Sequence, residues 1–282
     1  MERYLNPTND AAFKKVFATE ENKPLLRSLL NGLLRLEGDR QIAELQVFSR
    51  QIPPLLPGVQ NILFDVQCKD GAGNQYIVKI QNRVVPEYFF KHDLFYSSPA
   101  YVSQLSTGQP CLHFSPVILL SICNQDMFPE PDAISYHQIL NVDNGKQHLK
   151  DIGCVFVELQ KFKETENELT TLTDQWLFFL KMAHSQKEVP IAMRESEVKR
   201  AFDVLEQFNW SQMEYDLYIR VRLATESELG ALEEAKEKGF QEGFRQGLQE
   251  VRRATAANML KQGIPMATIQ QATGLSEEEI RG

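Results

Sequence analysis

The sequence contains no apolar run that could cross a membrane, although 43% of its 282 residues are hydrophobic. The best candidate, PVILLSIC at residues 116–123, is far shorter than the roughly 20 residues that a membrane-spanning helix needs. The opening residues, MERYLNPTND, lack the apolar segment of a secretory signal. These absences predict a cytoplasmic protein with no membrane part, and its apolar content suffices for one large domain with an appendage.

Cysteine is scarce, and the usual nucleotide-binding and hydrolase signatures are missing. No Cys-x-x-Cys pair occurs, and no histidine stands at metal-ligand spacing from a cysteine, so reduced thiols are expected. The sequence has no Gly-x-Gly-x-x-Gly, Walker or Gly-x-Ser-x-Gly motif, which argues against a phosphate-binding loop and a serine hydrolase. The four scattered cysteines are Cys68, Cys111, Cys123 and Cys154.

Basic charge is also in short supply. The 30 Lys and Arg residues are outnumbered by 38 Asp and Glu residues, which gives a net charge of −8. Proteins that bind nucleic acid broadly and non-specifically usually contain an excess of basic residues, so the negative net charge argues against this kind of binding. A local basic patch can still bind DNA in an acidic protein. A metal site built from carboxylates is itself acidic.

The stretch that organises the chain is NILFDVQCKDGAGNQYIVKIQ, at residues 61–81. Residues 62–68 and 75–81 are apolar and rich in β-branched side chains, which predicts two strands. The residues between them are typical of a tight turn, and we expect Gly71 and Gly73 to supply the positive φ that a hairpin needs. A β-hairpin is therefore predicted here.

Polar residues interrupt both strands of this hairpin. Asp65 lies in the middle of the first strand, and Lys79 and Gln81 lie near the end of the second. Lys79 and Gln81 are two residues apart, so they share one face of their strand. The hairpin is expected to bring them close to Asp65, and such a convergence in an apolar sheet suggests a functional site.

This arrangement resembles the PD-(D/E)XK nucleases and, more closely, the Rpn family of recombination-promoting nucleases, also described as PD-(D/E)XK family transposases. The family pattern is an acid on the first strand, a short hairpin, and a strand that ends Glu-x-Gln. Asp65 matches the acid and Gln81 the glutamine, but Lys79 stands where the family has Glu. The resemblance implies a restriction-endonuclease-like α/β fold, with a mixed central sheet flanked by helices, in a bacterial protein. It covers about residues 6–162 and the tail.

Two further stretches carry the resemblance. NDAAFKKVF at residues 9–17 is similar to the family's opening helix. Thr8, Asn9 and Asp10 are the candidates for its cap, and Asp10 either joins the metal site or only caps the helix. Residues 84–105 are expected to be helical. In the family these positions hold a basic residue, tyrosines and a glutamine, which here are Lys91, Tyr96 and Gln104.

The resemblance implies that Lys91, Tyr96 and Gln104 contact the substrate. A structural interpretation also stands for the tyrosines and for Lys91: they belong to an aromatic-rich helix that simply packs on the sheet. A last match is Glu-Leu-x-Lys-Phe at residues 158–162. For its Glu158 and Lys161, an ion pair or strand cap is the structural alternative to a role in the site.

The implied activity is hydrolysis of DNA phosphodiester bonds with Mg²⁺ or Mn²⁺. Mg²⁺ prefers oxygen ligands, so Asp65 and Asp10 are the metal-ligand candidates, with Gln81 at the place of the catalytic lysine. Lys79 removes one ligand and adds a cation, which costs roughly 4 kcal/mol for each unit charge at about 4 Å and an effective dielectric of about 20. The metal affinity should therefore fall sharply.

Three interpretations of Lys79 stay open. Asp10, or another acid such as Glu44 or Glu87, completes the site. Alternatively Lys79 pairs with Asp65 in an inactive relative, or Lys79 arose to silence a nuclease. The rival from another class is a non-enzymatic, oligomerising DNA- or partner-binding module.

Hydrophobic spacing predicts the other elements of the nuclease-like domain, expected over residues 1–228. Apolar residues three and four apart indicate helices, and continuous or alternating apolar runs indicate strands. The helices are expected over residues 11–17, 23–36, 173–208 and 212–228, and the strands over 116–123, 134–142 and 151–159. Residues 41–57 are expected to be a short strand or extended stretch that ends in a proline-rich loop.

Beyond residue 228 the composition changes twice. Residues 229–253 repeat glycine every four residues, each followed by an apolar residue: Gly239-Phe240, Gly243-Phe244 and Gly247-Leu248. Such a stripe is typical of close helix contact, so we expect a homo-oligomer formed through this arm. Residues 254–282 predict a small helix-turn-helix-like tail, with Gly274 as the turn and Ser276 as a cap. Acids follow Ser276, which favours a helical cap over a DNA reader.

Overall fold

The computed structural model describes residues 3–48, 66–81, 101, 104 and 114–281. It divides into two compact units, residues 1–223 and 224–282, and each is described by itself. Three of the predicted site residues lie outside the described residues, namely Asp65, Lys91 and Tyr96. The helix expected over residues 84–105 also lies largely outside them.

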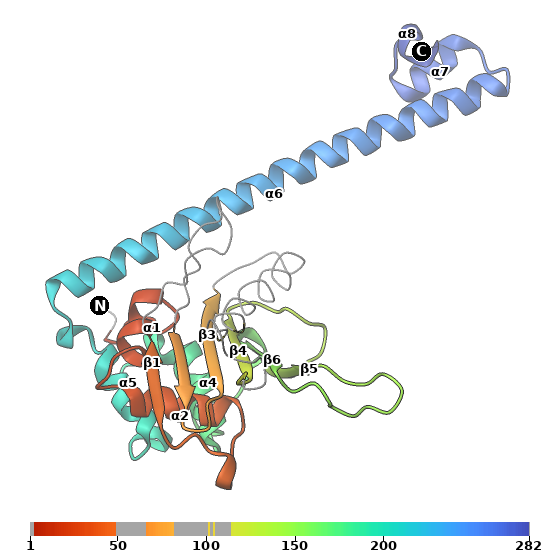
Figure 1. The fold of residues 1–282 in the computed structure, drawn as a ribbon. Helices are drawn as coiled ribbons and strands as arrows, with labels where there is room; N and C mark the ends of the chain where they lie inside the picture. Colours follow the sequence, from red (N-terminus) through yellow and green to blue (C-terminus); the bar gives the residue numbers. More distant parts are fainter. Residues whose placement is uncertain (1–2, 49–65, 82–100, 102–103, 105–113, 282) are drawn as a thin grey trace. The chain divides into compact units, whose positions relative to one another are not determined.

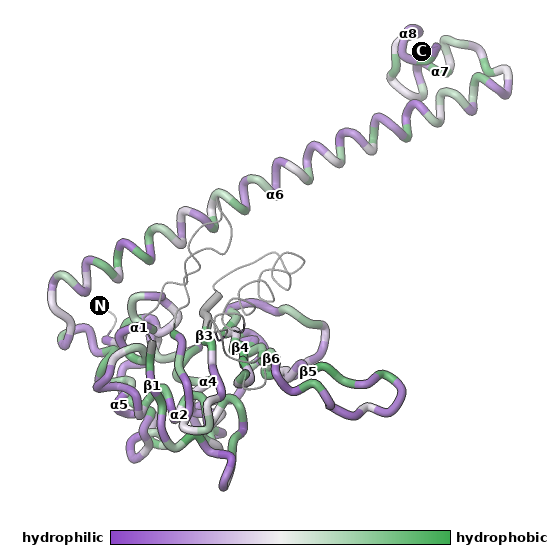
Figure 2. The backbone as a smooth tube through the Cα atoms, in the orientation of Figure 1, coloured by the Kyte–Doolittle hydropathy of each residue, from purple (hydrophilic) through white to green (hydrophobic). Residues whose placement is uncertain are grey.

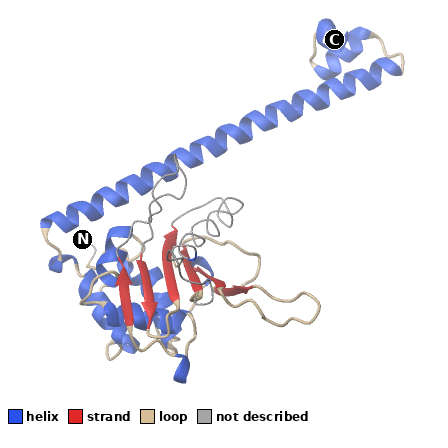
Figure 3. Ribbon diagram, viewed as in Figure 1, coloured by secondary structure: helices blue, strands red, loops and turns tan. Residues whose placement is uncertain are grey.

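The first unit is built on a mixed sheet, which confirms the α/β fold with a mixed central sheet (Figures 1 and 3). Its strand order is β1-β2-β3-β4-β6-β5. The pairs β3–β4 and β4–β6 are parallel, and the other three pairs are antiparallel. The strands are β1 (Leu45–Phe48), β2 (Val66–Asp70), β3 (Gln75–Gln81), β4 (Val117–Cys123), β5 (Ile134–Gln138) and β6 (Ile152–Glu158).

The predicted hairpin is present as β2 and β3, with Val66 opposite Val78 in an antiparallel register. Its turn is closed by Asp70, whose carboxylate accepts hydrogen bonds from the backbone N–H of Asn74 and from its side chain, each at 2.8 Å. The prediction of two glycines with positive φ is wrong for Gly71. Only Gly73 has one, at +97°, because a single left-handed residue suffices once Asp70 holds the turn.

Within the described residues, one core is shared by one face of the sheet and the helices α1 (Asp10–Phe17), α2 (Lys23–Leu33), α4 (Leu172–Met182) and α5 (Glu197–Leu205). In α2, leucines at helical spacing form one buried stripe. Figure 1 shows these helices gathered beside the strands. The core between the layers includes Trp176, Phe179 and Phe202, whose rings meet edge to face at 5.1–5.6 Å between centroids.

Several predicted boundaries are wrong, each for a local reason. The helix expected over residues 23–36 ends at Leu33, because Arg35 adopts a positive φ of 50°. The helix expected over residues 173–208 is divided into α4 and α5 by short 3₁₀ turns and by Pro190, which lacks a backbone N–H. The strand expected over residues 134–142 ends at Gln138, where its partner strand β6 begins.

The other sheet face has smaller apolar clusters. In the described part, Ile77, Val117 and Leu119 form one, with Tyr101 packed against it. Cys123, Met127 and Phe156 form a second. The inner strand β4 is thus buried on both faces, as expected for the inner strands of a parallel sheet, whereas β5 at the outside of the sheet is largely exposed. Figure 2 shows the hydropathy along each strand.

The second unit contains α6 (Gln212–Lys261) from Ala224 onwards, α7 (Met266–Thr273) and α8 (Glu277–Arg281). Ala256, Ile269 and Leu275 form its small core. The predicted turn is confirmed, since Gly274 ends α7 in the left-handed region at φ +69°. The predicted cap is confirmed too: Ser276 Oγ accepts from Glu279 N at 3.2 Å, and Ser276 N donates to the Glu279 carboxylate at 2.8 Å.

In the described part of the chain, no helix is both long and apolar enough to cross a bilayer.

Candidate functional site

The carboxyl ends of three parallel strands meet at one edge of the sheet. The register aligns Gln81 of β3 with Cys123 of β4, and Cys123 with Glu158 of β6. One residue pair earlier on the same face, Lys79 aligns with Ser121, which is fully buried. In open α/β sheets, ligands bind outside the carboxyl ends of the strands. The predicted positions on β3 therefore lie at the edge where a binding site is expected.

Glu158, at this edge, is buried and has charged and backbone partners. Its Oε2 lies 2.5 Å from Lys161 Nζ and accepts backbone N–H groups from Met127 at 2.8 Å and Phe128 at 3.3 Å. Lys161 Nζ also donates to the Phe128 carbonyl at 2.9 Å. Glu158 Oε1 is buried without a hydrogen-bond partner in the structure as described. The ion pair considered as the structural interpretation of this motif is confirmed, and it holds the loop after β4 against the end of β6.

Asp10 is the first residue of α1 and not its cap, so the capping interpretation is wrong. Asn9 caps the helix, because its Oδ1 accepts from Ala11 N at 3.0 Å and Ala12 N at 3.4 Å. The Asp10 carboxylate lies 2.9 Å from Lys14 Nζ, one turn along the helix, and its charge suits the helix N-terminus. Metal binding by Asp10 stays a prediction.

Gln104 and Tyr101 fix the segment that leads into β4. The Gln104 side chain accepts from Ser115 N at 2.8 Å and donates to Ser115 O at 2.9 Å. Tyr101 packs on the sheet, and its hydroxyl donates to Asp151 at 2.8 Å. Sequence reasoning did not find Asp151, and no signal could have paired it with a tyrosine 50 residues away. Substrate contact by Gln104 stays a prediction.

Burial controls the ionisable groups beside the hairpin. It raises the pKa of the Cys68 thiol to about 12, so this cysteine stays protonated and is unsuited to be a nucleophile. Burial, followed by its hydrogen bond to Asp70, also raises the pKa of Tyr76. Cys123 is buried and Cys154 half-buried, and neither forms a disulfide with another described residue.

The described residues do not provide a complete set of ligands for a divalent cation. These contain no group of three His, Cys, Asp or Glu side chains that could hold a metal, whereas Mg²⁺ takes several oxygen ligands. Lys79 is a lysine and so has no oxygen donor to offer a metal. Asp65 directly precedes β2 in the sequence and lies outside the described residues. The oxygen donors among the described residues are, by themselves, too few to hold Mg²⁺.

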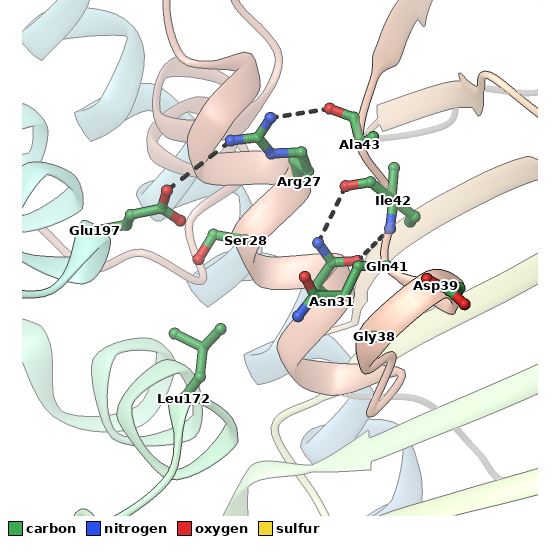
Figure 4. A pocket seen from close by; sticks show the side chains of 10 residues that line it. All are labelled: Arg27, Ser28, Asn31, Gly38, Asp39, Gln41, Ile42, Ala43, Leu172 and Glu197. Carbon is green, nitrogen blue, oxygen red and sulfur yellow. Dashed lines mark hydrogen bonds and ion pairs between the residues drawn. The ribbon is translucent and has the colours of Figure 1, made fainter.

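A cavity of about 500 Å³ lies on the helix-covered side of the sheet, between α2 and the chain that enters β1 (Figure 4). The polar side chains that line the cavity form hydrogen bonds with the backbone of the segment that enters β1. Arg27 donates to Ala43 O at 2.9 Å, and Asn31 accepts from Ile42 N at 2.8 Å and donates to its carbonyl at 3.2 Å. Glu197 lies 4.0 Å from Arg27. These contacts support the fold and indicate no ligand.

Comparison with known families finds two matches. The PD-(D/E)XK nuclease family transposase model matches residues 7–228. The model of the C-terminal HTH domain of the Rpn/YhgA-like nuclease family matches residues 249–282. No curated protein and no solved structure matches the chain. The first match covers more than half of the sequence and includes the whole hairpin with Lys79 and Gln81.

Proposed function

The chain belongs to the PD-(D/E)XK nuclease family transposases, and we propose that it is a cytoplasmic, metal-dependent DNA endonuclease of the recombination-promoting type. The observation that supports this most directly is the position of β3. It is an inner strand whose last residues, Lys79 and Gln81, reach the carboxyl-end edge that β3 shares with β4 and β6. Ligands of open α/β sheets bind outside the carboxyl ends of the strands, so this position supports a role of Lys79 and Gln81 in the site.

The proposed roles follow the family pattern residue by residue. Asp65 is the first metal ligand, Asp10 is the second candidate, and Gln81 takes the place of the lysine that orients the attacking water or the phosphate. Bound Mg²⁺ or Mn²⁺ would polarise the phosphate and lower the pKa of that water. Lys91 and Tyr96 would contact the substrate, together with Gln104.

The tail supports DNA as the substrate. The match to a helix-turn-helix domain favours DNA binding over the role of a simple helical cap. Glu277, Glu278 and Glu279 begin α8, so this helix presents acids at its N-terminal turn. We therefore expect the phosphate contacts to come from the basic end of α6, where Arg252 and Arg253 are exposed.

A second candidate function rests on Lys79. A lysine at the acid's position weakens metal binding by charge repulsion, and the described residues lack a complete ligand set. The nuclease domain would then serve as an inactive, oligomerising module that binds DNA or a partner through the same surfaces.

Plasmid cleavage with Mg²⁺ or Mn²⁺ tests the proposal. The wild type, Asp65→Ala and Lys79→Glu are compared, with Lys187→Glu as a matched charge reversal at an exposed position. DNA binding is measured separately by gel shift without metal. Cleavage that is lost in Asp65→Ala supports the endonuclease, and cleavage by Lys79→Glu alone identifies a silenced nuclease. If none of the variants cuts while DNA binding persists, the endonuclease proposal fails and the binding module replaces it.

A further inference from the structure

The edge strand β5 lacks the usual protection against pairing with another strand. It stands at one end of the strand order, so its outer side has no partner within the described part of the sheet. Edge strands normally carry lysine, proline or a bulge, which discourages contact with a strand of another molecule. Residues 134–142, ISYHQILNV, contain no Lys, Arg, Asp, Glu or Pro. The sequence of this edge therefore leaves it open to another strand.

Large apolar side chains continue from β5 into the loop that joins it to β6, residues 139–150. Figure 1 shows this β5–β6 loop projecting away from the sheet. Leu140 is 51% exposed and Val142 fully exposed, and Ile139 is exposed as well. Clustered apolar side chains that project into water usually mark an interaction surface.

The backbone of this segment shows which of its groups point outward. Ala133 O accepts from Glu158 N at 2.8 Å, and Asn141 N donates to Lys146 O at 2.9 Å. Both residues therefore turn their backbone groups towards β6 and the returning limb of the loop. Because these groups alternate in direction along a strand, the even-numbered residues of 134–142 turn their N–H and C=O groups outward. An antiparallel partner strand would bond to those groups.

The same even-numbered positions carry apolar side chains on the helix-covered face of the sheet. Ile134 is buried in the core that the sheet shares with the helices. The Tyr136 hydroxyl donates to Leu33 O at the end of α2, at 2.8 Å. Side chains two residues apart in a strand share a face, so Leu140 and Val142 extend this apolar face into the loop.

We propose that the occupant of this edge is β5 of a second copy of the chain, paired antiparallel about a two-fold axis at Gln138. An axis at an even-numbered residue sets the outward backbone groups of the two copies against one another, and Gln138 is the centre of the segment. Tyr136 then lies opposite Leu140 of the partner subunit, and Ile134 opposite the partner subunit's Val142. About ten backbone hydrogen bonds would join the two sheets, and the exposed apolar side chains would cover one another.

Charge complementarity supports a second copy in this orientation. Residues 126–133, which lead into β5, contain three acids and no Lys or Arg, whereas residues 144–150 contain two lysines and no acid. An antiparallel pair sets the entry to β5 in one copy beside the loop of the other, so acids and lysines meet twice about the axis. A parallel pair in register would bring like charges together, which is repulsive.

The pairing leaves the candidate site open and does not depend on nuclease activity. The loop leaves β5 at Gln138, which is paired with Gly153 near the start of β6. The candidate site lies at the other end of β6, where Glu158 ends the strand. A test of cleavage and a test of pairing can therefore fail separately.

Disulfide trapping in the full chain tests the register. In a hydrogen-bonded antiparallel pair, opposite Cα atoms are about 5.5 Å apart, which suits a disulfide. Gln138→Cys, on the axis, should therefore give a crosslinked dimer on mild oxidation, and the wild type controls for the chain's own thiols. Leu140→Cys is the matched control, because two copies of position 140 are four residues, about 13 Å, apart.

We expect Leu140→Cys to remain uncrosslinked alone and to crosslink when it is mixed with Tyr136→Cys, which it faces. Failure of Gln138→Cys to crosslink, or equal crosslinking of Leu140→Cys alone, would overturn the proposal. The crosslink reports this register, so association through another part of the chain does not substitute for it.

A charge placed on the apolar face tests the contact itself. In the Gln138→Cys background, Leu140→Lys should lower the yield of the crosslink roughly tenfold, because it buries an ammonium group against the partner subunit's Tyr136. Leu149→Lys is the matched control, since Leu149 is 63% exposed in the returning limb of the loop and lies outside the paired segment. Its yield should not change, and circular dichroism should show that both variants are folded.

A crosslink that persists in the Leu140→Lys variant, or that is lost equally in the Leu149→Lys variant, would refute the pairing. Such a result would include the case in which this edge binds a different protein.

Discussion

Lys161 Nζ lies 2.5 Å from Glu158 Oε2, with only 9% and 1% of the two side chains exposed. The pair is at the sheet edge that also holds the end of β3, because Glu158 and Gln81 flank the same residue of β4, Cys123. Glu158 also accepts the backbone N–H of Met127. A buried charge is costly when it is unpaired, so each member of the pair depends on the other to hold this edge in place.

Removal of one partner of the Glu158–Lys161 ion pair should therefore strongly lower the stability of the fold. We expect Lys161→Met to lower the free energy of unfolding by about 3–5 kcal/mol, because it leaves the Glu158 carboxylate buried and without its cation. Urea unfolding measures this change. Lys199→Met is the matched control: its ion pair with Asp203, at 2.7 Å, is about half exposed and should contribute at most about 1 kcal/mol. Equal losses in the two variants would refute this account.

The hairpin turn offers a comparison between two glycines. Gly73→Ala should lower stability by about 1–3 kcal/mol, because a side chain is strained at positive φ and its Cβ would lie 2.9 Å from Ser115 Oγ. Gly71→Ala should be neutral or slightly stabilising, since Gly71 has no positive φ and a Cβ there would meet nothing within 4 Å. Thermal unfolding of both variants decides the matter. A loss at Gly71 as large as at Gly73 would contradict the assigned turn.

A pH dependence is expected from Glu214, near the start of α6. The ammonium of Lys15, at 2.5 Å, and then the backbone N–H of Ser211 lower its pKa from 4.5 to about 2. A carboxyl group with a lowered folded-state pKa stabilises the fold above its unfolded pKa, and this stabilisation is lost as the pH falls from 4.5 towards 2. The Glu214 side chain is 44% exposed, so its contribution should be about 1 kcal/mol at most.

The measurement is urea unfolding of the wild type and Glu214→Gln across that pH range. The variant should lose less stability on acidification than the wild type. Lys15→Met should behave similarly, because it removes the largest cause of the lowered pKa. An unchanged pH dependence in Glu214→Gln would show that this contact does not contribute.

Metal binding can be separated from cleavage by thermal shift. We expect Mg²⁺ to raise the unfolding temperature of Lys79→Glu more than that of the wild type, because the change removes a cation and adds an oxygen donor. A chelator should reverse the shift, and Asp65→Ala in the Lys79→Glu background should abolish it. Lys187→Glu controls for the change in net charge. An equal Mg²⁺ response in Lys79→Glu and Lys187→Glu would place the metal, if it binds, elsewhere.

Sequence patterns predicted the buried strands well. The apolar run at residues 116–123 and the one at residues 151–159 correspond to β4 and β6 within one residue at each end. A strand covered on both faces must be apolar at almost every position. The first and last residues of the apolar run therefore mark the ends of the strand. The cap formed by Ser276 and Glu279 was predictable for a similar reason, because all its partners lie within four residues.

Boundaries that depend on a partner were less predictable. β5 stops where β6 begins to pair with it, and the apolar residues beyond Gln138 gave no sign of this. Asn9, rather than Asp10, caps α1 because the entering chain presents the Asn9 side chain to the first N–H groups. Both residues are chemically suitable caps, so composition alone could not choose between them.

The sequence by itself determined the hairpin, its polar positions Lys79 and Gln81, and the family to which they point, because strand period and turn chemistry are local properties. Only the tertiary structure decided that Gln81, Cys123 and Glu158 share one row at the sheet edge. That row exists because β4 lies between β3 and β6, with β5 outside them. Strand order is set by hydrogen bonds between backbone groups, which nearly all residues share, and by packing across the whole core, so no local pattern encodes it.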